Sequence, residues 1–318
     1  MSKTQLYKVL SESLNSKERT AKVYAASIRR IHREVFKKEL DDMSLKFIPK
    51  TKTLNFLKKI VNLTRRKNAA TALLMGLKAV NGTEKWMEKY RKIMMDADKD
   101  YQNFLVSGKR KRPFENAEAA WNTIIELHKK VGREIDARRL WELGESVSPS
   151  EYKILMAWIY LKWLSTMSPR RLEYSDTKLV TKEEYEADEE KDENFVVMGK
   201  RKWYWRIHRY KTVSRYGPQN LPIPGPLKLA LNKMKPIAFA KNRNGYVFLN
   251  NKFQKLSKSQ FSSFVKWVFL KYHGKPWTQN TVRSIKISSV WKPGTENPIS
   301  LAREMGHNVH TAVLHYKQ

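Results

Sequence analysis

The sequence predicts a two-domain protein that is mainly α-helical and carries a small β-sheet in its second half. The chain has 318 residues, of which 41% are hydrophobic, and this length is about twice that of an average domain. Apolar residues recur at helical spacing through the first 106 residues, whereas short strand-like segments begin only near residue 176. These observations favour a helical first domain followed by a mixed α/β second domain.

The helices of the first half are predicted from apolar residues that repeat every three or four positions. They are expected at residues 17–36, 54–63, 69–80 and 84–105. Asn81-Gly82 is typical of a helix C-terminus and ends the third of these segments. No alternating apolar pattern occurs in this half, so we expect no sheet there.

The second half combines helical and strand-like segments. Helices are expected at residues 149–166, where Ser148 is a suitable N-cap, and at residues 257–272, 278–290, 299–305 and 311–316. Strands are expected at residues 176–180, 194–198, 202–208 and 221–223. Residues 182–193 contain eight acidic and two basic side chains. We interpret them as a solvated loop that faces away from phosphate, because like charges repel.

The charge balance indicates a polyanionic partner. The formal net charge is +32, from 63 Lys and Arg against 31 Asp and Glu. Residues 1–116 contain 28 basic and 12 acidic side chains, which gives +16 and leaves +16 for residues 117–318. Both halves therefore offer basic surface to nucleic acid. A run of four cations is expected to form an exposed linker that contacts phosphate: Lys109, Arg110, Lys111 and Arg112.

Composition excludes several classes of protein. The sequence contains no cysteine, which excludes disulfide frameworks, Cys-ligated zinc and Cys nucleophiles. No apolar run reaches the roughly 18 residues that a membrane span needs. The sequence also lacks a P-loop, and the acidic residues outside the 182–193 run suggest no carboxylate cluster for a two-metal nuclease.

An ordered set of polar residues occupies the second half. Arg170 is followed three residues later by Glu173, although the adjacent Arg171 is an alternative for the same role. Lys211, in the segment Tyr-Lys-Thr, lies between two predicted strands, with Lys200 and Lys202 as alternatives.

The set continues towards the C-terminus. Arg283 follows Asn280 by three residues, and Gly306-His307 precedes Tyr316 by nine.

In this order the residues resemble the motifs of the tyrosine recombinases, the phage-integrase-type family of site-specific recombinases. The resemblance covers nearly all of the second half, and the basic helical first half is similar to the family's core-binding domain. It implies a helical core-binding domain at residues 1–107, a basic linker at 108–112 and a mixed α/β catalytic domain at 113–318, which together form a C-shaped DNA clamp. One departure is Asn280, because the family usually has histidine at this position.

The resemblance also implies an activity. Family members cleave and rejoin double-stranded DNA through a 3′-phosphotyrosine intermediate, as homotetramers on two duplexes, without metal or cofactor. Integration or excision of a mobile or viral element is the expected setting. The alternatives are a type IB DNA topoisomerase, or a DNA-binding relative whose active site has decayed at Asn280.

The chemistry of phosphodiester attack suits these residue types. Two arginines, Arg170 and Arg283, can hold the non-bridging oxygens with charge-assisted hydrogen bonds, and His307 adds a further donor. Tyr316 is the expected nucleophile. The resemblance makes Lys211 the general acid for the leaving 5′-oxygen. Asn280 can donate a hydrogen bond to phosphate but cannot accept the proton of the tyrosine.

Overall fold

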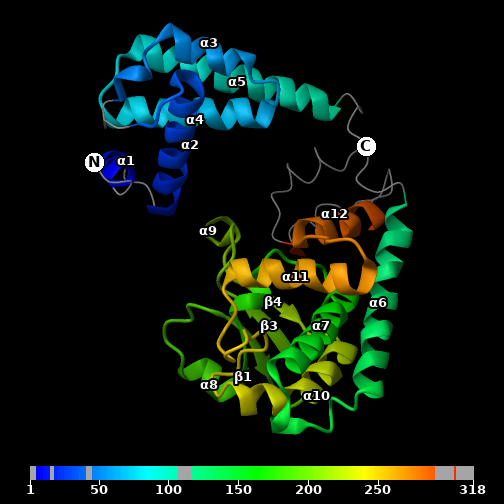
Figure 1. Ribbon diagram of the computed structural model, residues 1–318. Coiled ribbons are helices and arrows are strands. Elements are labelled where there is room, and N and C mark those ends of the chain that lie inside the picture. Colours follow the sequence, from blue (N-terminus) through cyan, green and yellow to red (C-terminus); the bar gives the residue numbers. More distant parts are fainter. Residues whose placement is uncertain (1–4, 15–17, 41–44, 107–115, 291–303, 306–318) are drawn as a thin grey trace. The chain divides into compact units, whose positions relative to one another are not determined.

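The computed structural model describes residues 5–14, 18–40, 45–106, 116–290 and 304–305 (Figure 1). Within these residues the protein is mainly α-helical and has one four-stranded sheet, so the predicted class of secondary structure is confirmed. The chain divides into two compact units, Met1–Lys111 and Arg112–Gln318. Each unit has its own hydrophobic core. The four cations of the predicted linker lie outside the described residues.

The first unit is helical throughout its described part. Its elements are α1 (Gln5–Leu14), α2 (Glu18–Phe36), a 3₁₀ turn η1 (Leu45–Phe47), α3 (Thr51–Lys59), α4 (Leu63–Ala79) and α5 (Glu84–Val106). The apolar face of α2 is buried at residues spaced by three or four positions: Ala21, Ala25, Ile28, Ile31 and Val35. Gly76 of α4 permits a close approach, because a Cβ there would lie 2.8 Å from the Ile48 side chain.

The helix expected over residues 54–63 is confirmed for residues 54–59, but the structure breaks it before Leu63. Helix α3 ends at Lys59, and α4 begins at Leu63. The side chain of Asn62 caps α4 by accepting a hydrogen bond from the backbone N–H of Arg65 at 2.9 Å. Val61 is 88% exposed, so it does not belong to a buried apolar face of the expected helix.

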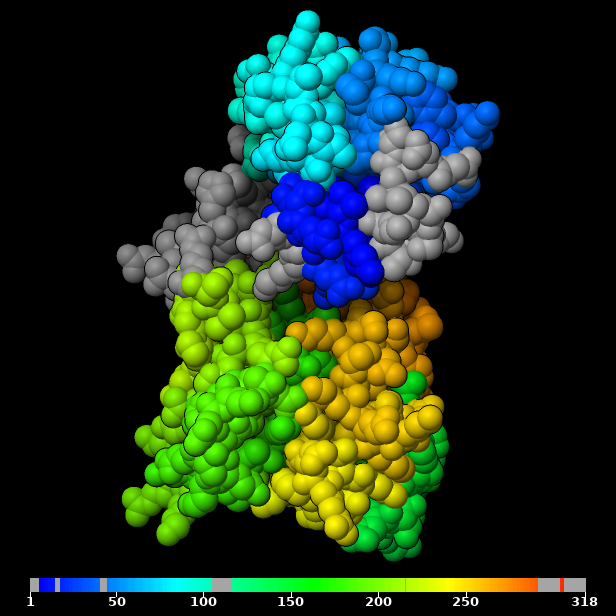
Figure 2. All heavy atoms as spheres, turned by 90° about the vertical axis from the view of Figure 1, so that its left-hand side faces the viewer, coloured from blue at the N-terminus to red at the C-terminus, as the bar shows by residue number. Residues whose placement is uncertain are grey.

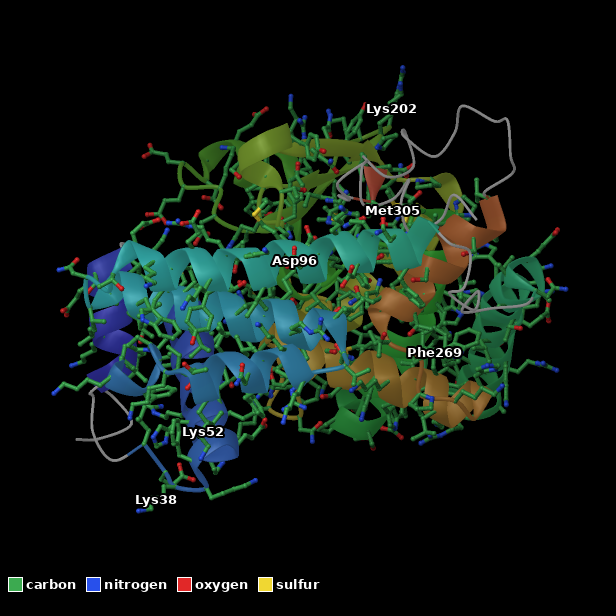
Figure 3. The ribbon with its side chains drawn as sticks, turned by 90° about the horizontal axis from the view of Figure 1, so that it is seen from above. Lys38, Lys52, Asp96, Lys202, Phe269 and Met305 are labelled. Carbon is green, nitrogen blue, oxygen red and sulfur yellow. The ribbon has the colours of Figure 1, made fainter. Side chains whose placement is uncertain are left out.

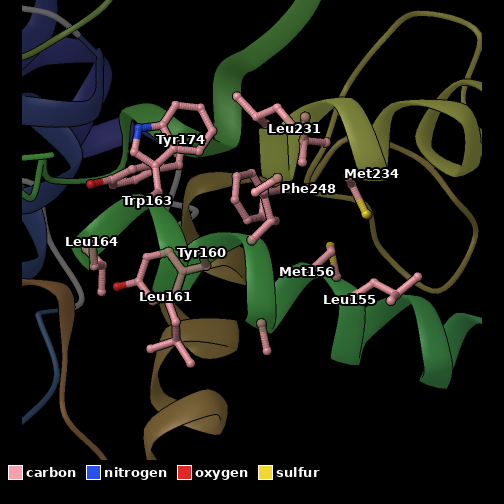
Figure 4. Packing of buried hydrophobic residues seen from close by; sticks show 14 of the residues in the cluster. Leu155, Met156, Tyr160, Leu161, Trp163, Leu164, Tyr174, Leu231, Met234 and Phe248 are labelled. Carbon is pink, nitrogen blue, oxygen red and sulfur yellow. The ribbon is translucent and has the colours of Figure 1, made fainter. Parts of the chain in front are cut away.

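The second unit is built around a buried helix. Its helices are α6 (Ala117–Ala137), α7 (Pro149–Thr166), α8 (Lys182–Ala187), α9 (Val213–Tyr216), α10 (Gly225–Lys241), α11 (Lys258–His273) and α12 (Gln279–Val290), with short turns η2 (Gly144–Ser146) and η3 (Glu173–Asp176). Ser148 caps α7, as the sequence suggested, and the structure adds Glu151 as its capping-box partner. The helix packs against α6 and α10, and Trp163 of α7 meets Phe248 in the core (Figure 4).

The strands of the sheet follow α7 and the short turn η3 along the chain. Its strands are β1 (Thr177–Thr181), β2 (Asn194–Met198), β3 (Trp203–Ile207) and β4 (Gln219–Pro222), in the order β1-β2-β3-β4. Strand β1 pairs parallel with β2, and the other pairs are antiparallel. Trp205 of β3 is fully buried beside Trp163, with ring centroids 4.8 Å apart, which joins the sheet to α7. The β3–β4 connection carries Lys211.

The acidic segment 182–193 is not the uniformly solvated loop that the sequence suggested. Its first half forms α8, whose N-terminus has a capping box between Thr181 and Glu184. Its last residue, Glu193, has a side chain only 8% exposed and forms ion pairs with Lys178 at 2.7 Å and Lys255 at 2.6 Å. Tyr246 also donates a hydrogen bond to Glu193. This carboxylate therefore stabilises the fold, because it joins β1 to the segment before α11.

Acidification is expected to destabilise the second unit through Glu193. Burial alone would raise the pKa of this carboxyl, but hydrogen bonds from Lys178, Lys255 and Tyr246 outweigh it and hold the pKa below its ordinary value of 4.5. The ionised form therefore stabilises the fold above that pH, and the stability is lost as the pH falls through the lower folded pKa.

Thermal unfolding from about pH 7 to about pH 3 measures this effect. Glu193→Gln should lower the unfolding temperature at neutral pH and flatten its dependence on acid, so that the curves of parent and variant converge at low pH. Curves that stay parallel over this range would show that Glu193 does not contribute to acid sensitivity.

Candidate active site

Arg170 is the most enclosed cation described in the second unit. It follows α7, has no exposed surface, and its guanidinium lies 5.0 Å from the ring centroid of Tyr210. Its Nη1 donates to the side chain of Gln219 at 2.5 Å and to the backbone carbonyl of Glu304. Its Nε and Nη2 have no hydrogen-bond partner within the described residues. Two donor groups of this buried cation are therefore unpaired in that part of the chain.

Arg283 and Arg170 both bind the last described segment of the chain, residues 304–305. Arg283 lies on α12, is 2% exposed, and donates from Nη2 to the backbone carbonyl of Met305 at 3.1 Å. Glu304 and Met305 are consecutive, so the two arginines bind neighbouring carbonyls. Met305 directly precedes Gly306. The fold thus brings together two arginines that are 113 positions apart in the sequence.

The electrostatics of this pair follow from burial. Burial lowers the pKa of Arg170, whereas the charge of nearby Glu173 raises it. Glu173 itself is 5% exposed and is the acid that follows Arg170 in the sequence motif. An arginine starts from a pKa so high that it stays protonated despite burial. The pair therefore supplies fixed positive charge that does not depend on the working pH.

A buried amide connects α12 to Arg170. Gln279, the first residue of α12, is 4% exposed. Its Nε2 donates to the backbone carbonyl of Arg170, and its Oε1 accepts from the hydroxyl of Tyr160 on α7. The sequence motifs did not single out this residue, because its partners are 109 and 119 positions away. It fixes the start of α12 relative to Arg170.

Replacing Gln279 with leucine should destabilise the protein. The substitution keeps the volume similar but leaves the Tyr160 hydroxyl and the Arg170 carbonyl buried without partners. Each such loss typically costs about 1–3 kcal/mol, so we expect the free energy of unfolding to fall by about 2–4 kcal/mol in denaturant titration. The exposed Gln254→Leu is the control and should change it little. An unchanged stability of Gln279→Leu would mean that these hydrogen bonds contribute nothing.

Lys211 and Asn280 share an open pocket beside the arginines. The pocket has a volume of about 370 Å³ and is lined by Lys211 of the β3–β4 connection, by Asn280 of α12 and by Arg171. In Figure 2 the yellow-green surface of the β3–β4 connection adjoins the orange surface of α11. The Oδ1 of Asn280 accepts a hydrogen bond from Arg283 Nη1 at 3.5 Å. Asn280 therefore lies between the pocket and the arginine pair.

The other predicted site residues lie elsewhere or outside the described residues. Lys200 and Lys202, the alternatives to Lys211, are exposed in the β2–β3 turn, and Lys202 extends from the edge of the second unit (Figure 3). His307 and Tyr316 lie outside the described residues. Arg171, the alternative to Arg170, lines the pocket and does not join the buried pair.

The described residues contain neither a candidate metal site nor a candidate membrane span. Within them, no group of three His, Cys, Asp or Glu side chains could hold a metal ion. No helix of the described part is both long and apolar enough to cross a bilayer.

Comparisons with known proteins find distant likenesses among solved structures only. No family model matches the sequence, and no curated protein matches it. Among solved structures, the chain is similar to the crystal structure of XerA recombinase, with 15% sequence identity and a TM-score of 0.37. The match covers 99% of this chain and 94% of that chain.

Proposed function

We propose that this protein is a DNA strand transferase of the tyrosine recombinase type, which cleaves and rejoins DNA through a 3′-phosphotyrosine intermediate. The observation that supports it most is the arginine pair. Arg170 and Arg283 are both buried and both donate to consecutive carbonyls, at Glu304 and Met305. The segment that follows contains His307 and Tyr316, the remaining residues of the motif set.

The reaction begins with the phenolic oxygen of Tyr316. It attacks the scissile phosphorus, a new P–O bond forms to the tyrosine, and the bond to the 5′-oxygen breaks. The phenolic proton leaves to water or to His307, and Lys211 gives a proton to the 5′-oxygen. Because the phosphotyrosine ester keeps the energy of the broken bond, attack by a 5′-hydroxyl reverses the step and rejoins the strand.

The arginines stabilise the charge that develops on the non-bridging oxygens. The Nε and Nη2 of Arg170, which have no partner in the described part of the chain, supply donors suited to this role, while its Nη1 stays on Gln219 and the Glu304 carbonyl. Asn280 donates a hydrogen bond from its amide nitrogen, since its Oδ1 faces Arg283. Fixed guanidinium charge takes the place that a metal ion has in other phosphoryl-transfer enzymes.

The wider role is also a proposal. A formal charge of +32, spread evenly over both halves, supports a protein that binds duplex DNA with both units. We propose that the first unit is a core-binding domain and the second a catalytic domain, with residues 108–112 as a basic linker. The proposed assembly is a homotetramer on two duplexes, in integration or excision of a mobile or viral element.

Covalent adduct formation tests the proposal. The protein is incubated with duplexes that carry a nick next to candidate cleavage sites, so that the released fragment diffuses away and the adduct accumulates. A denaturing gel should then show a protein–DNA adduct that survives boiling in detergent and disappears after protease. Absence of adduct on a library of such duplexes would contradict the proposal. Relaxation of supercoiled plasmid by monomeric protein would favour a type IB topoisomerase.

Arg170→Lys should separate the effect of positive charge on cleavage from the effect of the guanidinium's donor geometry. Lysine keeps the positive charge beside Glu173 but loses the planar fork of donors. We expect single-turnover cleavage to slow by about 10²-fold, because one oriented donor contributes on that scale. DNA affinity should change little. A cleavage rate equal to that of the parent would show that the guanidinium of Arg170 does not contact the reacting phosphate.

A further inference from the structure

The pocket beside the arginine pair has the chemistry of an anion site. Its lining includes two cations, Arg171 and Lys211, two hydroxyls, Ser262 and Thr278, and the amide of Asn280. Among the described residues, no carboxylate lines it. Every polar group named here can donate a hydrogen bond, so a ligand rich in acceptor oxygens matches the pocket.

Three of these groups have no partner among the residues that the structure describes. Neither Arg171 nor Lys211 forms an ion pair there, and the Ser262 hydroxyl makes no hydrogen bond there. Elsewhere in the same unit, Lys178 and Lys255 both form ion pairs with Glu193. Two cations facing one pocket without a counter-ion repel each other, and a bound anion relieves this repulsion.

The pocket is separate from the arginine pair. Arg170 and Arg283 are buried and do not line it, whereas Arg171 and Ser262 line it from two different elements, the segment after α7 and helix α11. Asn280 connects the two, because it lines the pocket and also accepts a hydrogen bond from Arg283. An anion in the pocket is therefore a near neighbour of one held by the arginines.

We propose that this pocket binds a second phosphate of the DNA backbone, next to the scissile phosphate, with Arg171 and Ser262 as its ligands. The inference rests on the proposed function, since it assumes that DNA is the substrate. A volume of about 370 Å³ leaves room for a phosphate with its adjoining sugar atoms and water. The second phosphate fixes the register of the strand, so that the scissile phosphate meets the arginine pair and Lys211.

Two pairs of variants test the site by fluorescence anisotropy on a labelled random-sequence duplex over a range of salt concentrations. Arg171→Gln should lower the slope of log affinity against log salt by about 0.9, the value for one released phosphate contact. The control Arg243→Gln removes the same charge from an exposed site of the second unit and should leave the slope nearly unchanged.

A second pair of variants changes only uncharged serines, so it is free of general charge effects on DNA binding. Ser262→Ala should weaken binding by about tenfold, as expected for a lost hydrogen bond to a charged group, and should leave the salt slope unchanged. Its control is Ser263→Ala, the next residue of α11, whose hydroxyl already donates to the Ser259 carbonyl at 3.2 Å and does not line this pocket. Thermal unfolding confirms that all four variants are folded.

The outcomes separate this inference from the proposed function. Effects of Arg171→Gln and Ser262→Ala that exceed those of their controls support the phosphate site. If the parent protein binds the duplex with a steep salt slope but each variant matches its control, the phosphate site is wrong while the proposed function stands. If the parent protein neither binds duplex DNA nor forms covalent adduct, the proposed function itself fails, and the phosphate site fails with it.

Discussion

Replacing Tyr316 with phenylalanine should abolish covalent adduct formation while DNA binding persists. In the proposed mechanism this substitution removes only the oxygen that becomes bonded to phosphorus, so the first chemical step has no nucleophile. Deleting a nucleophile in other enzymes lowers turnover by about 10⁶-fold, which places the variant below detection in a gel assay. Affinity for duplex DNA should stay within a few-fold of the parent value, since the phosphate contacts of the arginines and lysines are unchanged.

A matched control is Tyr204→Phe. Tyr204 lies on β3 and is partly exposed, and it too loses one phenolic oxygen. This variant should form adduct at the parental rate. Adduct formed by Tyr316→Phe would assign the nucleophile to another residue and would break the link between the Gly-His-Tyr motif and the chemistry.

The second large effect is expected at Lys211. If its ammonium gives a proton to the leaving 5′-oxygen, Lys211→Ala should slow cleavage by about 10²–10⁴-fold, the usual range for general acid catalysis. A substrate with sulfur in place of the bridging 5′-oxygen leaves as a thiolate and needs no proton. On this substrate the variant should cleave at nearly the rate of the parent protein.

Lys200→Ala and Lys202→Ala are the controls for this experiment. Both side chains are exposed in the β2–β3 turn, outside the pocket that contains Lys211. They should cleave the ordinary substrate normally. A defect in one of them that sulfur rescues, together with normal cleavage by Lys211→Ala, would move the general acid to that turn.

The fold could be predicted where local signals and burial agree. Helix α7 is an example, because Ser148 and Pro149 mark its start and its interior is apolar on every side. Helix α10 gave no clear signal: Pro236 lies inside it, and its sequence combines lysines with apolar residues on a weakly segregated face. Helix α8 was not predicted, because its high density of acidic residues is typical of a solvated loop. The Thr181–Glu184 spacing nevertheless matches a capping box.

The candidate site shows a different limit. Residues such as Arg170 and Arg283 were proposed from the order of the motifs, and the fold places them together. Their proposed catalytic roles still await the experiments above. Gln279 could not be found in this way, because its importance comes from hydrogen bonds to distant residues that no local pattern reports. The sequence predicted Arg171 only as an alternative to Arg170 in the same role. Sequence alone cannot distinguish a buried guanidinium from one that lines a pocket.

The hydrogen bond from Arg170 to the Glu304 carbonyl has a consequence for biosynthesis. Its partners are separated by 134 positions, so translation at about 5–20 residues per second adds the second partner roughly 7–27 s after the first. Over that interval the guanidinium lacks the Glu304 carbonyl, and α10 and α11, which complete the core around α7, are still being added. If the proposed function is correct, the basic surface of the nascent chain precedes the arrangement of Arg170 that strand transfer requires, so activity is acquired late in synthesis.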